Sequence, residues 1–236
     1  MDEETTVLFP DEPTFTASRP PPSRTRGFLQ DWAVAGITAV AALIVNKIPP
    51  FERPFSPTDP TLQHPVLADF VPDWLNVGIA VSVPIAVVGV VEWLRRGRGA
   101  EGGWRRVGRE MHYAGMVLAV VLVTSMLVTN VVKAWAGRLR PDFLARCAPI
   151  NNICTGSLHL VLEGRRSFPS GHSSTAFSGM GFLTFWLAQT TRVFGAPAGE
   201  GVAWRVMVSL APLFWATYVA ISSSQKAAPE FASTAS

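Results

Sequence analysis

The sequence predicts an all-α integral-membrane protein with about five transmembrane helices packed in one bundle. Hydrophobic residues make up 48% of the 236 positions and charged residues only 16%, and the mean hydropathy is positive at +0.26. A soluble domain of ordinary composition fits these values poorly. In addition, five separate stretches approach the ~20 mainly apolar residues that a membrane-spanning helix needs.

These five apolar stretches are the expected helices of the bundle. They cover residues 28–48, 74–94, 111–135, 173–191 and 206–224. The third and fourth are the clearest. The first is the weakest, because Asp31 and Lys47 lie near its ends and Lys47 must snorkel toward the membrane surface. A buried core helix is the alternative for that stretch.

The segments on either side of the bundle have a different composition. Residues 1–27 are acidic at first and then rich in proline and arginine. We expect them to form a disordered cytoplasmic tail, and they lack the apolar core of a signal peptide. The transmembrane domain is predicted to span residues 28–221, and residues 222–236 form a divergent tail rich in serine and alanine.

Arginines in the loops predict how the bundle is oriented. Six lie between the second and third stretches, at Arg95, Arg96, Arg98, Arg105, Arg106 and Arg109. The positive-inside rule places this loop in the cytoplasm, together with the amino-terminal tail. The proline-rich residues 49–70 then lie on the lumenal or extracytoplasmic side. The sequence makes no prediction about the organelle or the oligomeric state.

A second basic loop, residues 136–169, falls on the outer side in this topology. It holds five arginines, at Arg138, Arg140, Arg146, Arg165 and Arg166. Binding of an anionic substrate would account for cations on this side, and contact with lipid headgroups is the alternative. Nucleic acid is not an expected partner despite the sequence pI of about 9.2, because the arginines are confined to short loops.

The two cysteines of the chain, Cys147 and Cys154, both lie in this outer loop. An oxidising lumen would allow a disulfide that holds the loop. Two free thiols remain the alternative, because sequence spacing says nothing about the distance between the two Cα atoms. A metal site is not expected, since His159 is the one nearby additional ligand and the three residues lack the usual zinc spacing.

The first of two motifs that point to phosphate chemistry begins this loop. It reads Lys-Ala-Trp-Ala-Gly-Arg-Leu-Arg-Pro and places Lys133, Arg138 and Arg140 just after the third apolar stretch. Ammonium and guanidinium groups are the natural partners of a phosphate dianion. Arg140 is oriented by the rigid Pro141 that follows it, and its guanidinium can bind two phosphate oxygens at once.

The second motif, Phe-Pro-Ser-Gly-His, ends the loop and opens the fourth apolar stretch. It supplies Ser170, Gly171 and His172 in succession. At a helix N-terminus the backbone amides and the serine hydroxyl would face an anion. The imidazole of His172 is suited to protonating a leaving alkoxide. A lone histidine at this place would more often be structural, but its neighbours favour a role in chemistry.

Lys-x6-Arg-Pro followed by Pro-Ser-Gly-His resembles the type 2 phosphatidic acid phosphatase family, the lipid phosphate phosphatases. This family shares a helical core with vanadium haloperoxidases, and the resemblance spans roughly residues 71–221, closest to the eukaryotic branch. It implies that Lys133 and Arg140 bind the substrate phosphate. Arg138, the third cation of the first motif, is a candidate for an additional phosphate contact. The resemblance also implies that Ser170 and Gly171 hydrogen-bond the phosphate and that His172 is the general acid.

The same resemblance implies the wider properties of the protein. Such enzymes typically have six transmembrane helices, face the lumen or outside, and work through a phosphohistidine without a metal. Vanadate is the expected inhibitor. The substrates would be phosphatidate, diacylglycerol pyrophosphate, lysophosphatidate or related lipid phosphates, and membrane lipids would be the other partners.

The sequence departs from the family in its third motif, Ser-Arg-x5-His-x3-Asp, which supplies the attacking histidine. The chain follows the family up to Ser222, and no histidine occurs after His172. We therefore interpret the chain as truncated before this motif, with a gene-model or splicing artefact favoured over a short isoform or a pseudoenzyme. As written, it is expected to bind phosphate far better than it cleaves it, since His64 and His159 have no orienting partner. The alternative function is a catalytically dead membrane protein that binds phospholipid or a partner chain.

Overall fold

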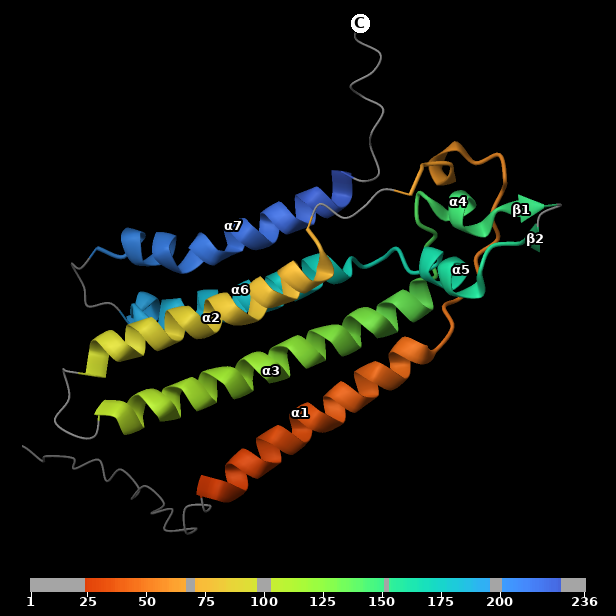
Figure 1. Ribbon diagram of the computed structural model, residues 1–236. Coiled ribbons are helices and arrows are strands. Elements are labelled where there is room, and N and C mark those ends of the chain that lie inside the picture. The colour runs from red at the N-terminus through yellow and green to blue at the C-terminus, as the bar shows by residue number, and fades with distance from the viewer. Residues whose placement is uncertain (1–23, 67–70, 97–102, 151–152, 196–200, 226–236) are drawn as a thin grey trace, which may run out of the picture.

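The computed structural model describes residues 24–66, 71–96, 103–150, 153–195 and 201–225, and it confirms the all-α membrane class. Five long helices dominate it: α1 (Arg24–Lys47), α2 (Asp73–Arg95), α3 (Gly103–Ala136), α6 (Gly171–Thr190) and α7 (Ala203–Gln225). Figure 1 shows them running lengthwise beside one another, with α1 and α7 at opposite edges. The predicted tail over residues 1–23 lies outside the described residues, as does most of 222–236.

Among the described residues, four helices are long and apolar enough to cross a membrane, namely α1, α2, α3 and α7. The fifth helix, α6, does not belong to this set, although its sequence was one of the two clearest predictions. Its first half is interrupted by serine and threonine, which lowers its apolarity. It packs against α2, α3 and α7, so these three helices cover part of its surface and less of it needs to be compatible with lipid.

The third helix is longer than the sequence predicted. It begins at Gly103, so Arg105, Arg106 and Arg109 lie in its first turns and the predicted six-arginine loop is shorter than expected. Arginine and glutamate are good helix formers, which favours this extension. The buried carboxylate of Glu92, near the end of α2, also lies 3.7 Å from Nε of Arg106. This ion pair joins the end of α2 to the beginning of α3. Arg98 lies outside the described residues.

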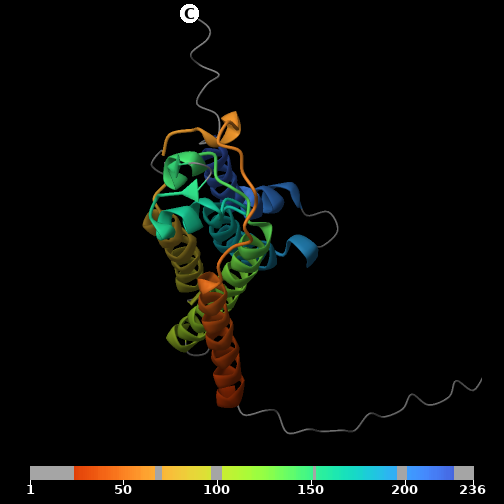
Figure 2. The same cartoon turned by 90° about the vertical axis from the view of Figure 1, so that its right-hand side faces the viewer.

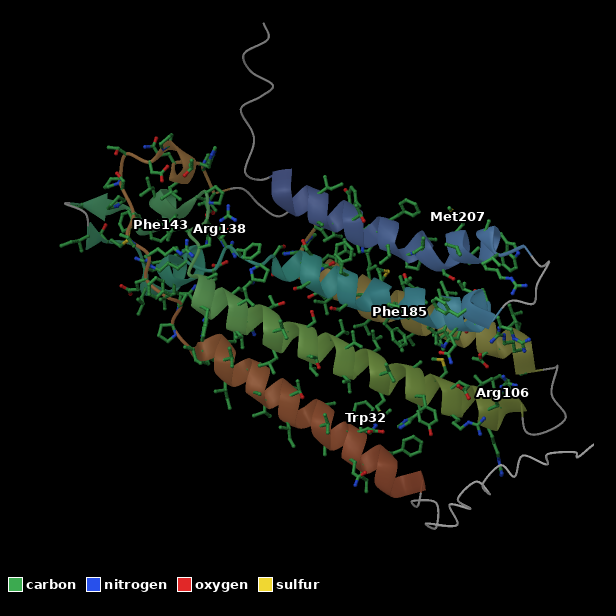
Figure 3. The ribbon with its side chains drawn as sticks, turned by 180° about the vertical axis from the view of Figure 1, so that it is seen from behind. Trp32, Arg106, Arg138, Phe143, Phe185 and Met207 are labelled. Atoms are coloured by element: carbon green, nitrogen blue, oxygen red, sulfur yellow. A yellow bond between two sulfur atoms is a disulfide. The ribbon has the colours of Figure 1, made fainter. Side chains whose placement is uncertain are left out.

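Close helix contacts hold the bundle together. A Cβ added at Gly179 of α6 would collide with the main chain of Ala80 on α2, so glycine is required at this approach. Between α6 and α7, a small buried cluster is formed by Ala176, Met180, Ala216 and Val219. Large apolar side chains are exposed on the bundle, among them Phe185 of α6 at 72% and Met207 of α7 at 67%, both labelled in Figure 3, as expected for a surface that meets lipid.

The segment between α3 and α6 forms a small cap at one end of the helices. It contains α4 (Phe143–Cys147), the antiparallel pair β1 (Pro149–Ile150) and β2 (Ile153–Cys154), and α5 (Leu158–Gly164). The short 3-10 helix η1 (Pro60–Leu62) from the loop after α1 covers it, and Figure 2 shows the whole cap above the helix ends. Phe143 and Leu62 are buried at its centre.

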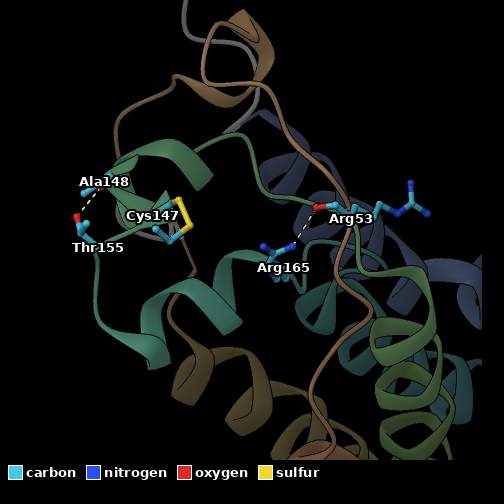
Figure 4. Close-up of a disulfide and its surroundings, with 6 residues drawn as sticks. Arg53, Cys147, Ala148, Thr155 and Arg165 are labelled. Carbon is cyan, nitrogen blue, oxygen red and sulfur yellow. Dashed lines mark hydrogen bonds between the residues drawn. A yellow bond between two sulfur atoms is a disulfide. The ribbon is translucent and has the colours of Figure 1, made fainter. Parts of the chain in front are cut away.

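A disulfide closes the cap. Cys147 and Cys154 are bonded, with their Cα atoms 4.6 Å apart, so the structure favours the disulfide over the two free thiols that the sequence had left open. Figure 4 shows the bond beside a hydrogen bond from Thr155 Oγ1 to the carbonyl oxygen of Ala148, at 2.6 Å. The bridge holds together the two ends of the β1–β2 hairpin.

Candidate active site

The first motif is held where α3 ends and the chain turns into the cap. Gly137 has a positive φ of 52°, and a Cβ at this position would collide with the carbonyl oxygen of Phe51. The backbone amide of Phe51 donates to the carbonyl oxygen of Ala134 at 2.8 Å, and Arg53 Nε donates to that of Ala136 at 2.7 Å. The segment after α1 is therefore fastened against the end of α3, and only glycine fits the turn that follows.

Hydrogen bonds between two loops bring the motifs together. The amide of Arg140 donates to the carbonyl oxygen of Gly164 at 2.8 Å, and the amide of Ser167 donates to that of Arg138 at 3.0 Å. Residues 138–140 thus run beside residues 164–167, which lead directly into the second motif. Figure 3 shows Arg138 at the junction between cap and helices.

Lys133 and Gly171 meet at this junction. The Nζ atom of Lys133, in the last turn of α3, lies 3.2 Å from where a Cβ on Gly171 would be. Glycine therefore leaves the ammonium group free to approach the N-terminus of α6. The charged groups that interact electrostatically with Lys133 are Arg140, Arg166, Asp73 and Glu163, so two cations and two carboxylates lie within electrostatic reach of its ammonium group.

Ser170 caps the N-terminus of α6. Its Oγ accepts a hydrogen bond from the amide of Ser173 at 3.3 Å, and its carbonyl oxygen accepts one from the amide of Ser174 at 3.1 Å. The hydroxyl proton of Ser170 remains to be donated to an oxygen in front of the helix. The amide of Gly171, the first residue of α6, has no acceptor within the helix, so this terminus is suited to an anion.

His172 lies against the first turn of α2. Its side chain is only 16% exposed, and its Nε2 lies 3.1 Å from Oδ1 of Asp73, an ion-pair distance that lacks the angles of a hydrogen bond. The carbonyl oxygen of His172 accepts a hydrogen bond from Asn76 Nδ2 at 3.0 Å. The sequence analysis missed both partners, although a carboxylate at the outer end of an apolar helix and an amide three residues later were visible signals.

Arg140 also has a carboxylate next to it. Its Nη1 lies 3.5 Å from Glu163 Oε1, a residue of α5 that sequence reasoning also missed. Both side chains are partly exposed, so the contact is a surface ion pair that an incoming anion can replace.

Three of the five arginines of the outer loop, Arg146, Arg165 and Arg166, have structural partners, so binding of an anionic substrate is not needed to account for them. Arg146 binds Asp142 at 2.8 Å and Glu163 at 3.2 Å, and the hydrogen bond to Asp142 raises the pKa of the Arg146 guanidinium. Arg165 donates to the carbonyl oxygen of Arg53 at 3.1 Å, as Figure 4 shows. These contacts within the cap thus account for much of the positive charge of the outer loop.

Arg166 ties the cap to the membrane helices. It donates to Oδ1 and the carbonyl oxygen of Asn46, both at 2.9 Å, and to the carbonyl oxygen of Ile48 at 2.6 Å. These acceptors lie at the C-terminal end of α1, where carbonyl groups lack partners within the helix. Arg166 therefore satisfies the end of α1 and stays within electrostatic reach of Lys133.

The two other outer histidines lie elsewhere on the cap. His159 is exposed on α5, and the amide of His64 donates to the carbonyl oxygen of Pro141 at 3.1 Å. Within the described part of the chain, no three His, Cys, Asp or Glu residues are grouped so as to hold a metal ion.

Together these contacts assemble a site suited to a phosphate group at the cap end of the bundle. Lys133 and Arg140 supply positive charge, the N-terminus of α6 supplies hydrogen-bond donors at Ser170 and Gly171, and His172 supplies an imidazole. Charge-assisted donors of this kind stabilise the equatorial oxygens of a phosphoryl group.

Comparison with known proteins points in the same direction. Residues 114–223 match the PAP2 superfamily. The chain is 36% identical to a PA-phosphatase related-family protein of Dictyostelium discoideum over 84% of this chain and 69% of that protein. It is 32% identical to lipid phosphate phosphatase 2 of Arabidopsis thaliana, over 84% and 67%, and 30% identical to diacylglycerol pyrophosphate phosphatase 1 of Saccharomyces cerevisiae, over 82% and 70%. No solved structure matches the chain.

Proposed function

The chain belongs to the PAP2 superfamily, and on this premise we propose that it is a membrane-embedded phosphatase whose site takes the phosphate of a lipid. The single observation that best supports the proposal is the approach of the Lys133 ammonium group to Gly171 at the N-terminus of α6. This contact joins the two motifs at the end of apolar helices, where the headgroup of a membrane lipid would lie.

Each candidate residue has a role in binding the phosphoryl group. Lys133 and Arg140 neutralise its negative charge, and Arg138 lies near enough in the sequence to add a further contact. The Ser170 hydroxyl and the Gly171 amide donate hydrogen bonds to its oxygens at the N-terminus of α6. Because Arg140 already pairs with Glu163 at 3.5 Å, phosphate binding exchanges a carboxylate partner for a phosphate one.

The proposed reaction divides into two displacements. A histidine nitrogen attacks phosphorus, the bond from phosphorus to the lipid oxygen breaks, and His172 gives that oxygen its proton. Water then cleaves the phosphohistidine and releases inorganic phosphate. No histidine follows His172 in these 236 residues, so we expect the chain, assayed as it stands, to bind phosphate and to turn over very slowly.

We propose that the site faces the lumen or the outside of the cell. The disulfide between Cys147 and Cys154 supports this side, because such bonds persist in oxidising compartments. The arginines at the opposite end of α2 and α3 support the same orientation through the positive-inside rule. The substrates that fit are phosphatidate, diacylglycerol pyrophosphate and related lipid phosphates, and the similarity to a lipid phosphate phosphatase and a diacylglycerol pyrophosphate phosphatase supports this class.

The test is phosphate release from phosphatidate in mixed micelles with a chelator present, followed with the purified chain. His172→Ala and Lys133→Met should abolish any release. Arg109→Gln, a charge change at the opposite end of α3, is the matched control and should have no effect. If release is too slow to measure, the wild-type chain should still be protected against heat by orthovanadate, and Lys133→Met should not be. A chain with neither release nor vanadate protection would refute the proposal.

A further inference from the structure

The first turn of α2 holds His172 at two places. Asp73 and Asn76 are three residues apart and therefore lie on one face of the helix. Asn76, which is buried, donates to the His172 carbonyl oxygen at 3.0 Å, while Asp73 lies 3.1 Å from the imidazole Nε2. Backbone and side chain of the same histidine are thus both contacted by α2.

The Asp73 carboxylate stands on the open side of the site. Its side chain is 89% exposed, whereas that of His172 is 16% exposed. A charged group that is open to water and contacts a mostly buried imidazole must approach it from the solvent side. That side is also the route by which a soluble anion would reach His172.

Asp73 also interacts with Lys133, the candidate phosphate-binding lysine of the site. It is one of the two carboxylates that interact electrostatically with Lys133, together with Glu163. Since Glu163 pairs with Arg140 at 3.5 Å, each candidate phosphate-binding cation has a carboxylate nearby before any ligand arrives. Of the two carboxylates, only Asp73 contacts the imidazole, and Glu163 is also engaged by Arg146 within the cap.

We propose that Asp73 is a resident counter-ion of the anion site, which competes with phosphate for His172 and Lys133 and thereby weakens phosphate binding. The proposal rests on the proposed function, because it assumes that phosphate binds where Lys133 and His172 converge. Its consequence is that inorganic phosphate, the product, leaves the site more easily. A carboxylate and a phosphate oxygen cannot both stay at ion-pair distance from the same imidazole without repelling each other.

The direction of the effect separates this role from a structural one. If Asp73 served only to support the fold around His172, its removal would weaken phosphate binding. If it competes with phosphate, its removal strengthens binding. Given the small energies of exposed ion pairs and the repulsion that a nearby dianion would feel, we expect affinity to rise about three- to tenfold. Salt screens such interactions, so the gain should shrink as ionic strength increases.

The experiment is calorimetric titration of the purified chain in detergent with inorganic phosphate and with orthovanadate. Asp73→Asn should bind both anions more tightly than the wild type, and Asp73→Glu, which keeps the carboxylate, should bind them as the wild type does. Asp59→Asn is the matched control, because Asp59 lies in the loop after α1 and accepts hydrogen bonds from Thr61. It makes the same charge change and should leave affinity unchanged.

The outcomes distinguish this inference from the proposed function. Tighter binding in Asp73→Asn but not in Asp59→Asn supports the inference, including the case in which the wild type binds too weakly to measure. Equal or weaker binding in Asp73→Asn overturns it, and the proposed function stands if Lys133→Met abolishes binding. If neither the wild type nor Asp73→Asn binds either anion, the proposed site falls and the inference falls with it.

Discussion

Replacement of Gly137 by alanine should destabilise the protein and disturb its anion site together. The φ of 52° is a left-handed conformation that costs an L-residue about 1–2 kcal/mol. The added Cβ would also collide with the carbonyl oxygen of Phe51, which is main chain and cannot rotate away. Overpacking of this kind costs about 1–3 kcal/mol. We therefore expect the free energy of unfolding to fall by about 2–5 kcal/mol.

Unfolding in mixed micelles, titrated with a denaturing detergent, measures this loss. Gly78→Ala on α2 is the matched control, since a Cβ there meets nothing within 4 Å and alanine favours a helix by about 0.5–1 kcal/mol. Orthovanadate protection of Gly137→Ala should weaken as well, because the turn joins Lys133 to Arg140. A variant within about 0.5 kcal/mol of the wild type would refute the reasoning, since that is the scale of an ordinary surface substitution.

Three further predictions concern the N-terminus of α6, the end of α1 and the disulfide of the cap. Ser170→Asp should keep the stability of the wild type, because aspartate caps helices as well as serine does, but it should abolish vanadate protection, because its carboxylate repels the anion. Ser170→Ala should instead lose about 1 kcal/mol of stability in a thermal unfolding assay. Arg166→Gln should lower the free energy of unfolding by about 1–3 kcal/mol, because it removes the hydrogen bonds to Asn46 at the end of α1. Limited proteolysis after α1 should then be faster, and an unchanged rate would contradict the prediction. Cys147→Ser, like reduction of the bond to Cys154, should cost about 2–3 kcal/mol because the closed loop is short, and a reducing agent should then have no further effect.

Much of the bundle could be predicted because its physical cause is local. Apolar runs of helix length indicated all five long helices, with ends within a few residues for α2 and α6. The beginning of α3 was wrong because the prediction followed apolarity alone. The residues before position 111 form helix through their propensity and through Arg106, whose ion pair with Glu92 of α2 is visible only in three dimensions.

The candidate site was predictable to the extent that its chemistry is contained in short motifs. Lys133, Arg140 and the Ser170–His172 segment were found by residue type and spacing, and the structure brings Lys133 beside Gly171. Asp73 and Asn76 were missed as partners of His172 because they come from another helix, with Asn76 lying 96 positions before the histidine. Two polar residues in an apolar helix are visible in the sequence, but the tertiary contact that gives each its role is not.

The arginines of the cap show why residue type alone overstates a binding site. Arg146, Arg165 and Arg166 lie in the same basic loop as Arg140, yet each satisfies carbonyl or carboxylate groups of the cap and of α1. A guanidinium held by several such partners is less able to move toward a ligand. Arg140 differs because its partner Glu163 is partly exposed and already shared with Arg146. An incoming phosphate can therefore take over Arg140 while Glu163 keeps Arg146, and the cap stays intact when the site is occupied.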